Sequence, residues 1–228
     1  MEKSDPRYQA YIQILKEELI PAMGCTEPIA LAYAGAVAKK TLGEQPDKVK
    51  VEASGSIIKN VKSVIVPNTG HLKGINAAVT AGIVAGNPDK QLEVIAQVSP
   101  EQIQQMKQFM EDVPIEIEHL AGGCTFDIIV TVYHGEDYAK VRIANYHTNI
   151  VLVEKNGKVL RSEAVSDDSE DGLTDRTLLD MEHIWDFATT VDISDVKELL
   201  DQQISCNVAI AEEGLKNDYG ANIGKVLL

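Results

Sequence analysis

The chain has 228 residues, a length that suits one large domain or two small ones and allows a sizeable buried core. Hydrophobic residues make up 44% of it and charged residues 25%, which is the balance of a folded globular protein and excludes general disorder. The formal net charge of −14 repels phosphate backbones and argues against nucleic acid as a partner. We expect a protein without a membrane span, because no apolar run in the sequence approaches the roughly 18 residues that a span needs.

The cysteines and the first residues indicate the compartment. Cys25, Cys124 and Cys206 are odd in number and far apart, and no CxxC pair occurs. A disulfide framework is therefore not expected, and the polar first residues show no signal peptide, so we expect a cytoplasmic protein. One acidic run, at Asp167, Asp168, Glu170 and Asp171, predicts a solvated loop.

The first half of the chain predicts mostly helices. Apolar residues at helical spacing predict an amphipathic helix over 7–19. An alanine-rich segment from Pro28 to about Leu42 predicts a second, buried helix that Gly43 ends. Further elements are expected as strands at 49–53, 61–66 and 92–97, a helix at 72–85, and a helix that Ser99 caps and Pro100 opens.

After Pro114 the pattern changes to closely spaced strands. Strands are expected at 115–118, 126–133, 138–144 and 150–153, with hairpin turns at 135–137 and 155–157, which together predict an antiparallel meander. Helices are expected again from about residue 175 to 215, with Ser194 and Asp195 capping the last long one. The apolar residues 223–228 predict an element that continues beyond the last residue.

These elements predict an α+β fold, with a mixed, largely antiparallel sheet packed against helices. No strict strand–helix alternation appears, so a doubly wound sheet is disfavoured. We expect residues 1–228 to form one region, divisible into two lobes at 1–112 and 113–228.

The first candidate functional residue is Cys25, within Gly24-Cys25-Thr26-Glu27-Pro28. We expect Thr26 to cap the second helix and Pro28 to occupy its first turn, which places the thiol at the positive helix end. Such a position lowers the pKa of a thiol. The alternative is a buried structural cysteine before an ordinary helix cap.

Two further segments carry polar groups at the ends of elements. Asn68, Thr69 and Gly70 precede a predicted helix, and with its backbone N–H groups they could bind a carboxylate; the alternative is a plain turn. The segment 145–149 contains His147, whose pKa near neutrality suits a general acid or base. The alternative there is a strand-edge bulge with a hydrogen-bonded histidine.

The remaining candidates are weaker. Cys124 lies in Gly122-Gly123-Cys124-Thr125, which echoes the first motif but reads mainly as a tight turn. Cys206 is expected in a helical core. The others are interpreted as surface, packing or helix-end residues: His119, His134, His183, Glu212 and Glu213.

Taken together, these motifs resemble a known family. The run from Pro21 to Pro28 is similar to the opening of the L-cysteine desulfidases, which are related to the iron–sulfur L-serine dehydratases. The resemblance continues in order over essentially the whole chain, through 66–70, 86–88, 147–149, 211–215 and Tyr219-Gly220. It implies that the chain corresponds to the N-terminal half of such an enzyme.

The resemblance implies a lyase of amino-acid catabolism. A [4Fe–4S] cluster with one open iron would polarise the substrate's thiol or hydroxyl, a base would remove the α-proton, and L-cysteine or L-serine would yield pyruvate, ammonia and sulfide or water. It implies catalytic roles for Cys25 and His147, with Cys25 as a base or proton shuttle. The substrate-binding residues that it implies are Thr26, Glu27, Asn68, Thr69, Gly70, Thr148 and Asn149.

The cysteines depart from this pattern. Members of the resembled family are about twice as long and hold their cluster in the second half, an arrangement that Cys25, Cys124 and Cys206 do not reproduce. We therefore expect no cluster on this chain alone, no activity in isolation, and a C-terminal half or partner subunit that carries the cluster cysteines. The choice between cysteine and serine, and the formation of a homo-oligomer, stay open. Two other functions stay open as well: a non-catalytic amino-acid-binding module and a cluster-free hydrolase with a cysteine nucleophile.

Overall fold

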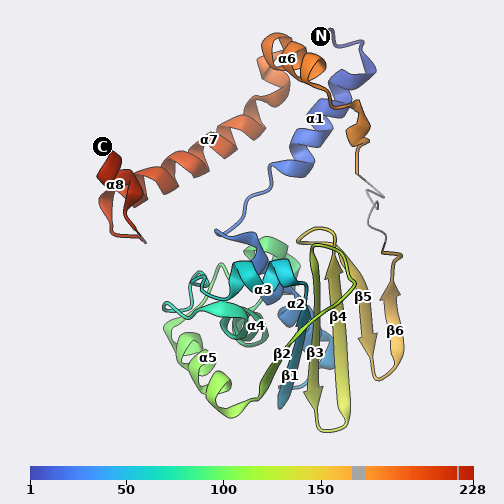
Figure 1. Ribbon diagram of the computed structural model, residues 1–228, viewed down its shortest axis with the longest axis vertical. Coiled ribbons are helices and arrows are strands. Elements are labelled where there is room, and N and C mark those ends of the chain that lie inside the picture. Colours follow the sequence, from blue (N-terminus) through green and yellow to red (C-terminus); the bar gives the residue numbers. More distant parts are fainter. Residues whose placement is uncertain (166–172, 220) are drawn as a thin grey trace. The chain divides into compact units, whose positions relative to one another are not determined.

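The computed structural model describes residues 1–165, 173–219 and 221–228, and the chain divides into two compact units (Figure 1). The larger unit comprises residues 22–169, and the smaller comprises residues 1–21 together with 170–228. This division differs from the expected lobes 1–112 and 113–228. The acidic run at 167–171, expected as a solvated loop, lies outside the described residues.

The larger unit contains a sheet with the strand order β2-β1-β3-β4-β5-β6 (Figure 1). The bounds are β1 Lys48–Ala53, β2 Ile115–His119, β3 Asp127–His134, β4 Asp137–Ala144, β5 Ile150–Lys155 and β6 Lys158–Ser162. All neighbouring strands are antiparallel except β1 and β2, which are parallel. The predicted α+β class with a mixed, largely antiparallel sheet is confirmed. The meander itself begins at β3, because β2 pairs with β1, and this pairing also joins the two expected lobes in one sheet.

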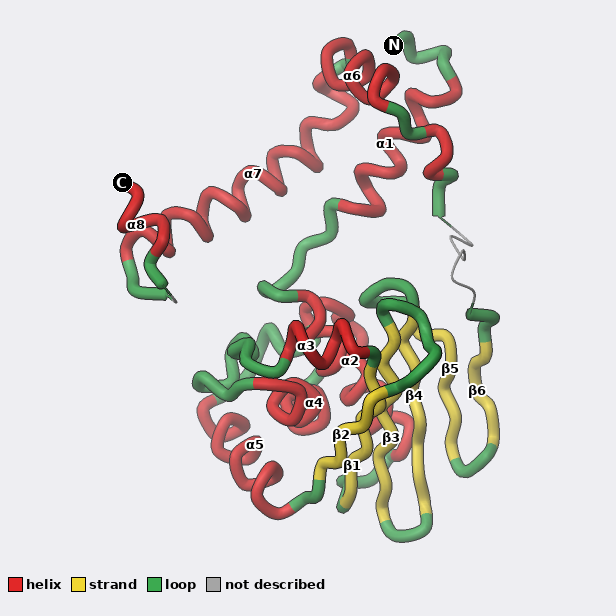
Figure 2. The backbone as a smooth tube through the Cα atoms, in the orientation of Figure 1, coloured by secondary structure: helices red, strands yellow, loops and turns green. Residues whose placement is uncertain are grey.

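Helices cover one face of this sheet in layers (Figure 2). Helix α2, Thr26–Leu42, packs against β3 and β4, and α4, Gly74–Ala85, packs against the opposite side of α2. Because α2 contacts elements on both sides, its alanine-rich sequence is apolar all round. Helix α5, Pro100–Asp112, packs on α4 and begins with the expected cap, where Ser99 and Gln102 form a reciprocal capping box.

The α2–α4 crossing brings the two backbones into contact. A Cβ atom added at Gly82 would lie 1.8 Å from the carbonyl oxygen of Ala32, and one at Gly35 would lie 2.8 Å from that of Val79. No side chain larger than hydrogen fits at either glycine. The two helices are therefore closely packed, and this contact with α4 fixes the position of α2, which begins at Thr26.

Two of the expected strands are wrong. Segment 61–66 begins with the last residue of helix α3, Gly55–Val61, and contributes only an isolated bridge between Ile65 and Lys73. Segment 92–97 begins in the last two residues of the 3₁₀-helix η1, Pro88–Glu93, and continues as turns and bends. Both segments are apolar because Val66 and Ile95 are buried in the core, and a short buried run does not distinguish a strand from a turn.

The smaller unit is helical. It contains α1 Pro6–Glu18, η2 Arg176–Leu178, α6 Met181–Thr190, α7 Ile193–Lys216 and α8 Ile223–Leu227. Its core is a cluster of Tyr8, Tyr11, Ile12, Ile14, Phe187 and Val196. In the described part of the chain, no helix is both long enough and apolar enough to cross a membrane.

Two predictions about the smaller unit are wrong. Helix α7 is capped by Asp192, whose carboxylate accepts the backbone N–H of Ser194, and not by Ser194 and Asp195. Cys206 is exposed instead of buried, because the apolar face of α7 follows positions 196, 200, 204 and 208, and residue 206 lies on a different side. The helix-end assignment of Glu212 and Glu213 is confirmed, since α7 ends at Lys216.

Candidate functional site

The N-terminus of α2 is formed by the first candidate motif. Cys25 is the N-cap residue, with φ −60° and ψ 122°, so the expected cap at Thr26 is wrong by one residue; Pro28 lies in the first turn as expected. Gly24 has φ +122°, a conformation that suits glycine, and a Cβ there would lie 3.6 Å from Pro67. The chain therefore turns into the helix directly beside the 66–70 segment.

A hydrogen bond connects this helix end to the loop between β4 and β5. The Thr26 hydroxyl and Nε2 of His147 lie 2.8 Å apart, and the imidazole packs on the ring of Phe126 with 4.5 Å between centroids. The Asn149 side chain donates to the carbonyl of Ala144 at 3.0 Å and so closes the loop that carries His147. The imidazole is half-buried and fixed by contacts on two sides.

The Cys25 thiol takes part in a second chain of hydrogen bonds. It donates to Oε2 of Glu27 at 3.0 Å, and Nδ2 of Asn60, in α3, donates to Oε1 of the same carboxylate at 2.9 Å. Sequence reasoning did not find Asn60 or Phe126, because neither belongs to a motif and only the fold brings them to α2. The thiol, the carboxylate and the imidazole thus occupy the first turn of one helix and the loop beside it.

The pKa values in this cluster are shifted in opposite directions. Partial burial and the hydrogen bond to Glu27 raise the pKa of Cys25, with a smaller opposing effect from the Glu27 backbone N–H. The expected lowering by the helix end is therefore wrong, because burial and the adjacent Glu27 carboxylate outweigh it. The hydrogen bond from Cys25 lowers the pKa of Glu27. Burial lowers the pKa of His147, against the opposing charge of Glu27.

These shifts define the protonation states near pH 7. The Cys25 thiol keeps its proton, the Glu27 carboxyl is ionised and the His147 imidazole is neutral. A proton donor and a proton acceptor are therefore present together. Titratable groups whose environments separate their pKa values in this way are typical of acid–base sites.

The predicted carboxylate-binding turn is held by its own side chains. Nδ2 of Asn68 donates to the carbonyl of Ile95 at 3.1 Å, and the buried Thr69 hydroxyl donates to the carbonyl of Val66 at 2.8 Å. Gly70 has φ +66°, and a Cβ there would lie 3.0 Å from Ile103. These contacts explain the shape of the turn, and substrate binding by its three residues stays a prediction.

The other candidates lie at different places in the fold. Thr148 is half-buried in the His147 loop, where Asn149 has the loop-closing bond, and their substrate contacts also stay predictions. Cys124 is buried in a small cluster with Ala144 and Val151. His134 lies 2.9 Å from the carbonyl of Gln45, and His183 pairs with Asp180 at 2.5 Å.

The described residues do not fit an iron–sulfur cluster. They contain no group of three or more His, Cys, Asp or Glu side chains that could hold a metal ion. Cys25 and Cys124 belong to the larger unit and Cys206 to the smaller one.

The fold and the site define an α+β protein with a hydrogen-bonded cluster of titratable side chains at a helix N-terminus. The chain is similar to proteins named UPF0597: it is 53% identical to that of Desulfitobacterium hafniense strain Y51 over 228 residues, which is 100% of this chain and 53% of the relative. It is 43% identical to that of Lachnoclostridium phytofermentans over 97% of this chain and 53% of the relative. The identity to that of Treponema denticola is 41%, over 97% of this chain and 52% of the relative.

The chain thus spans about half the length of the curated relatives that it matches. No family model matches it, and no solved structure matches it. The assignment by resemblance to the L-cysteine desulfidases and L-serine dehydratases is overturned, because these relatives carry the name UPF0597 and not that of a desulfidase or dehydratase. A function must therefore be argued from the site.

Proposed function

We propose that the cluster of Cys25, Glu27 and His147 is the proton-transfer site of a lyase that removes the β-substituent of a small amino acid, L-cysteine or L-serine. The observation that carries the proposal is the Thr26–His147 hydrogen bond of 2.8 Å. It holds a neutral imidazole beside a helix end that also presents a protonated thiol. β-Elimination needs both functions, because one C–H bond is broken while the leaving group is protonated.

Each group has a role in this reaction. The His147 imidazole accepts the α-proton, the electron pair forms the Cα–Cβ double bond, and the Cβ–S or Cβ–O bond breaks. The Cys25 thiol gives its proton to the departing sulfide or hydroxide, and transfer of the imidazolium proton back to the thiolate through water restores both groups. The aminoacrylate product hydrolyses to pyruvate and ammonia. The substrate carboxylate binds at the Asn68-Thr69-Gly70 turn, beside the N-terminus of α2.

Glu27 sets the direction of proton transfer. Its carboxylate accepts the Cys25 thiol hydrogen bond and raises the pKa of the thiol, so Cys25 remains a donor. Asn60 holds that carboxylate from the other side. The two hydrogen bonds to the Glu27 carboxylate therefore hold the thiol in a fixed orientation at the helix end.

The same contacts argue against a cysteine-nucleophile hydrolase. Such an enzyme needs a thiolate activated by a base, usually an imidazole that accepts its proton. Here the thiol donates its hydrogen bond to Glu27, the imidazole is hydrogen-bonded to Thr26, and the pKa of the thiol is raised. An amino-acid-binding module without turnover is the second candidate, and it differs from a lyase only in the absence of product.

The proposal concerns a site that acts within a longer assembly. Since the chain spans about half of each relative, we expect no turnover by the 228-residue chain alone. Within this proposal the reaction takes place in the reducing cytoplasm, where the Cys25 thiol stays available.

Substrate protection of Cys25 tests the site. The chain is alkylated with iodoacetamide, and modification of Cys25 and Cys206 is followed separately by mass spectrometry, with L-serine or D-serine present. We expect L-serine to slow alkylation of Cys25 at least threefold while Cys206, exposed on α7, reacts unchanged. Equal protection by D-serine, or none by L-serine, contradicts the proposed site.

Turnover separates the lyase from the binding module. The full-length Desulfitobacterium hafniense relative is assayed anaerobically for pyruvate from L-serine and for pyruvate and sulfide from L-cysteine. Product from the relative, together with protection of Cys25 in this chain, supports a lyase. Protection without any product from the relative favours the binding module.

A further inference from the structure

Helix α7 has one continuous apolar face. Its residues are spaced by three or four positions, so they share one side of the helix: Val196, Leu200, Ile204, Val208, Ala211 and Leu215. The first part is used inside the smaller unit, where Val196 is 3% exposed and Leu200 packs on the cluster around Tyr8 and Phe187. The apolar face therefore begins as part of a core.

The second part of the same face is bare. Ile204 is 56% exposed, Val208 is 49% exposed and Leu215 is 43% exposed. We call this part, from Ile204 to Leu215, the distal stripe. A row of large aliphatic side chains along one face of a helix is unfavourable in water. Such an exposed apolar face indicates an interaction surface.

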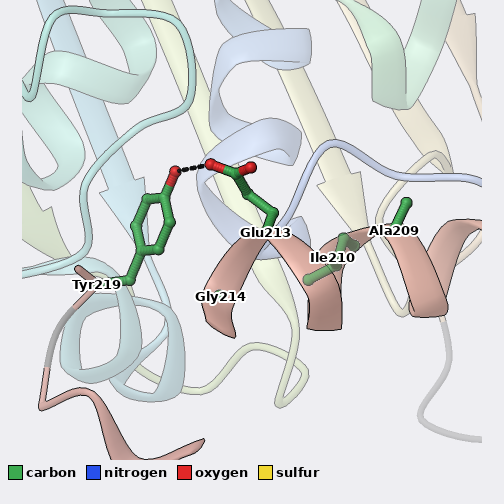
Figure 3. A pocket seen from close by; sticks show the side chains of 5 residues that line it. All are labelled: Ala209, Ile210, Glu213, Gly214 and Tyr219. Atoms are coloured by element: carbon green, nitrogen blue, oxygen red, sulfur yellow. Dashed lines mark hydrogen bonds between the residues drawn. The ribbon is translucent and has the colours of Figure 1, made fainter. Parts of the chain in front are cut away.

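Helix α8 extends this surface at its far end. A Cβ at Gly224 would lie 3.5 Å from the Leu215 side chain, so α8 packs where the stripe ends. Figure 3 shows a hollow on the other side of α7, where the Tyr219 hydroxyl donates to Glu213 at 2.7 Å. The hollow has a volume of about 480 Å³ and is lined by Ala209, Ile210, Glu213, Gly214 and Tyr219.

We propose that the distal stripe docks an apolar-faced helix from polypeptide that corresponds to the half of the UPF0597 relatives that this chain does not span. The relatives carry a comparable length of polypeptide beyond the matched half, since the match covers 53% of the Desulfitobacterium protein. A narrow stripe with four-residue spacing suits a packed helix, whose side-chain ridges fit between such rows.

Charge argues against a second copy of this chain as the occupant. Each copy carries a formal net charge of −14, so association of two copies is opposed by repulsion. The larger unit of the same chain is the other alternative occupant. A second copy would give a homodimer, and the larger unit would give slow hydrogen exchange over 204–215 in the isolated chain, so the experiment below distinguishes both from the proposed occupant.

The experiment co-expresses the tagged 228-residue chain with the part of the Desulfitobacterium hafniense relative that lies outside the match. Affinity purification is followed by size-exclusion chromatography with light scattering. We expect a one-to-one complex, and we expect the double variant Ile204→Asp with Val208→Asp to lose at least 90% of it. The matched control, Gln202→Asp with Ser205→Asp, adds the same charge on exposed positions away from the stripe and should retain the complex.

Measurements on the isolated chain complete the test. The circular dichroism spectra of both double variants should match the unaltered chain, because all four side chains are exposed. The unaltered chain should run as a monomer, with rapid amide hydrogen exchange over 204–215 that slows in the complex. Absence of a complex, a complex that survives the stripe variant, a homodimer broken by that variant, or slow exchange in the isolated chain would each overturn the proposal.

Discussion

The Thr26 hydroxyl and Nε2 of His147 lie 2.8 Å apart although 121 positions separate them in the sequence. This bond fixes the first turn of α2 against the loop between β4 and β5. Because Cys25 immediately precedes Thr26, the same bond sets where the thiol lies relative to the imidazole. The acid–base chemistry that we propose at this helix end depends on it.

Removal of the Thr26 hydroxyl tests this relationship. Thr26→Val keeps the shape of the side chain but leaves the half-buried imidazole without its partner, and we expect the free energy of unfolding to fall by about 1 kcal/mol. We also expect L-serine to lose its protection of Cys25, measured by alkylation. Thr26→Ser retains the hydroxyl and should preserve both properties; equal loss in the two variants would contradict a role for the hydrogen bond.

Burial and the hydrogen bond to Glu27 both raise the pKa of the Cys25 thiol. Glu27→Gln removes the negative charge that opposes thiolate formation, so the pKa of Cys25 should fall and its alkylation near pH 8 should accelerate about threefold or more. The measurement is the pH dependence of iodoacetamide labelling at Cys25, with Cys206 as internal reference. Glu44→Gln, on the exposed turn after α2, is the control and should leave the profile unchanged. An unaltered profile in Glu27→Gln would contradict the assignment.

Acid should weaken the smaller unit through Glu17. Burial raises the pKa of Glu17, but the hydrogen bonds from Arg176 and Thr174 outweigh it and lower the pKa to about 2. A carboxyl with a lowered folded pKa contributes stability above its unfolded pKa of about 4.3, and this contribution is lost as the pH falls towards 2. Urea unfolding followed by the fluorescence of Trp185, which lies in α6, should show this loss between pH 5 and pH 2. Glu17→Gln should flatten the pH dependence, and a variant as pH-sensitive as the unaltered chain would contradict the prediction.

The close contact of α2 and α4 should not tolerate a methyl group. Gly82→Ala places a Cβ where the Ala32 carbonyl oxygen lies, 1.8 Å away, so the helices must separate. We expect the free energy of unfolding of the larger unit to fall by about 3 kcal/mol, measured by urea and circular dichroism. Gly214→Ala is the control, because nothing lies within 4 Å of its added Cβ and alanine favours a helix by about 0.5–1 kcal/mol. A Gly82→Ala chain as stable as the original would contradict the geometry.

Local sequence determined several elements because their signals are short-range. Pro6, the capping box at Ser99 and Gly43 in the left-handed conformation mark helix ends where the structure has them. Closely spaced β-rich segments and the hairpin turns between them likewise predicted the strands of the meander. Segments 61–66 and 92–97 were misassigned as strands because their apolar residues are buried in turns. A short buried apolar run has no periodicity that would distinguish a turn from a strand.

The candidate site shows the same division. The sequence identified Cys25 and His147 as polar groups at element boundaries, but it predicted the wrong direction for the pKa of the thiol. The helix end is a local feature that the sequence reveals, whereas the Glu27 side-chain orientation and the Asn60 contact depend on where α3 packs. Electrostatic effects follow distances in space, and those distances are fixed only when distant segments pack together.

The sequence by itself determined the α+β class, most helix and strand positions, and the residue types available for proton transfer. Only the tertiary structure decided that β2 joins β1 in parallel, that His147 reaches Thr26, and that half of the apolar face of α7 stays bare. The physical reason is the distance along the chain over which each interaction acts. Backbone propensities and caps act within a few residues, while pairing, burial and pKa values depend on groups that folding brings together from far along the chain.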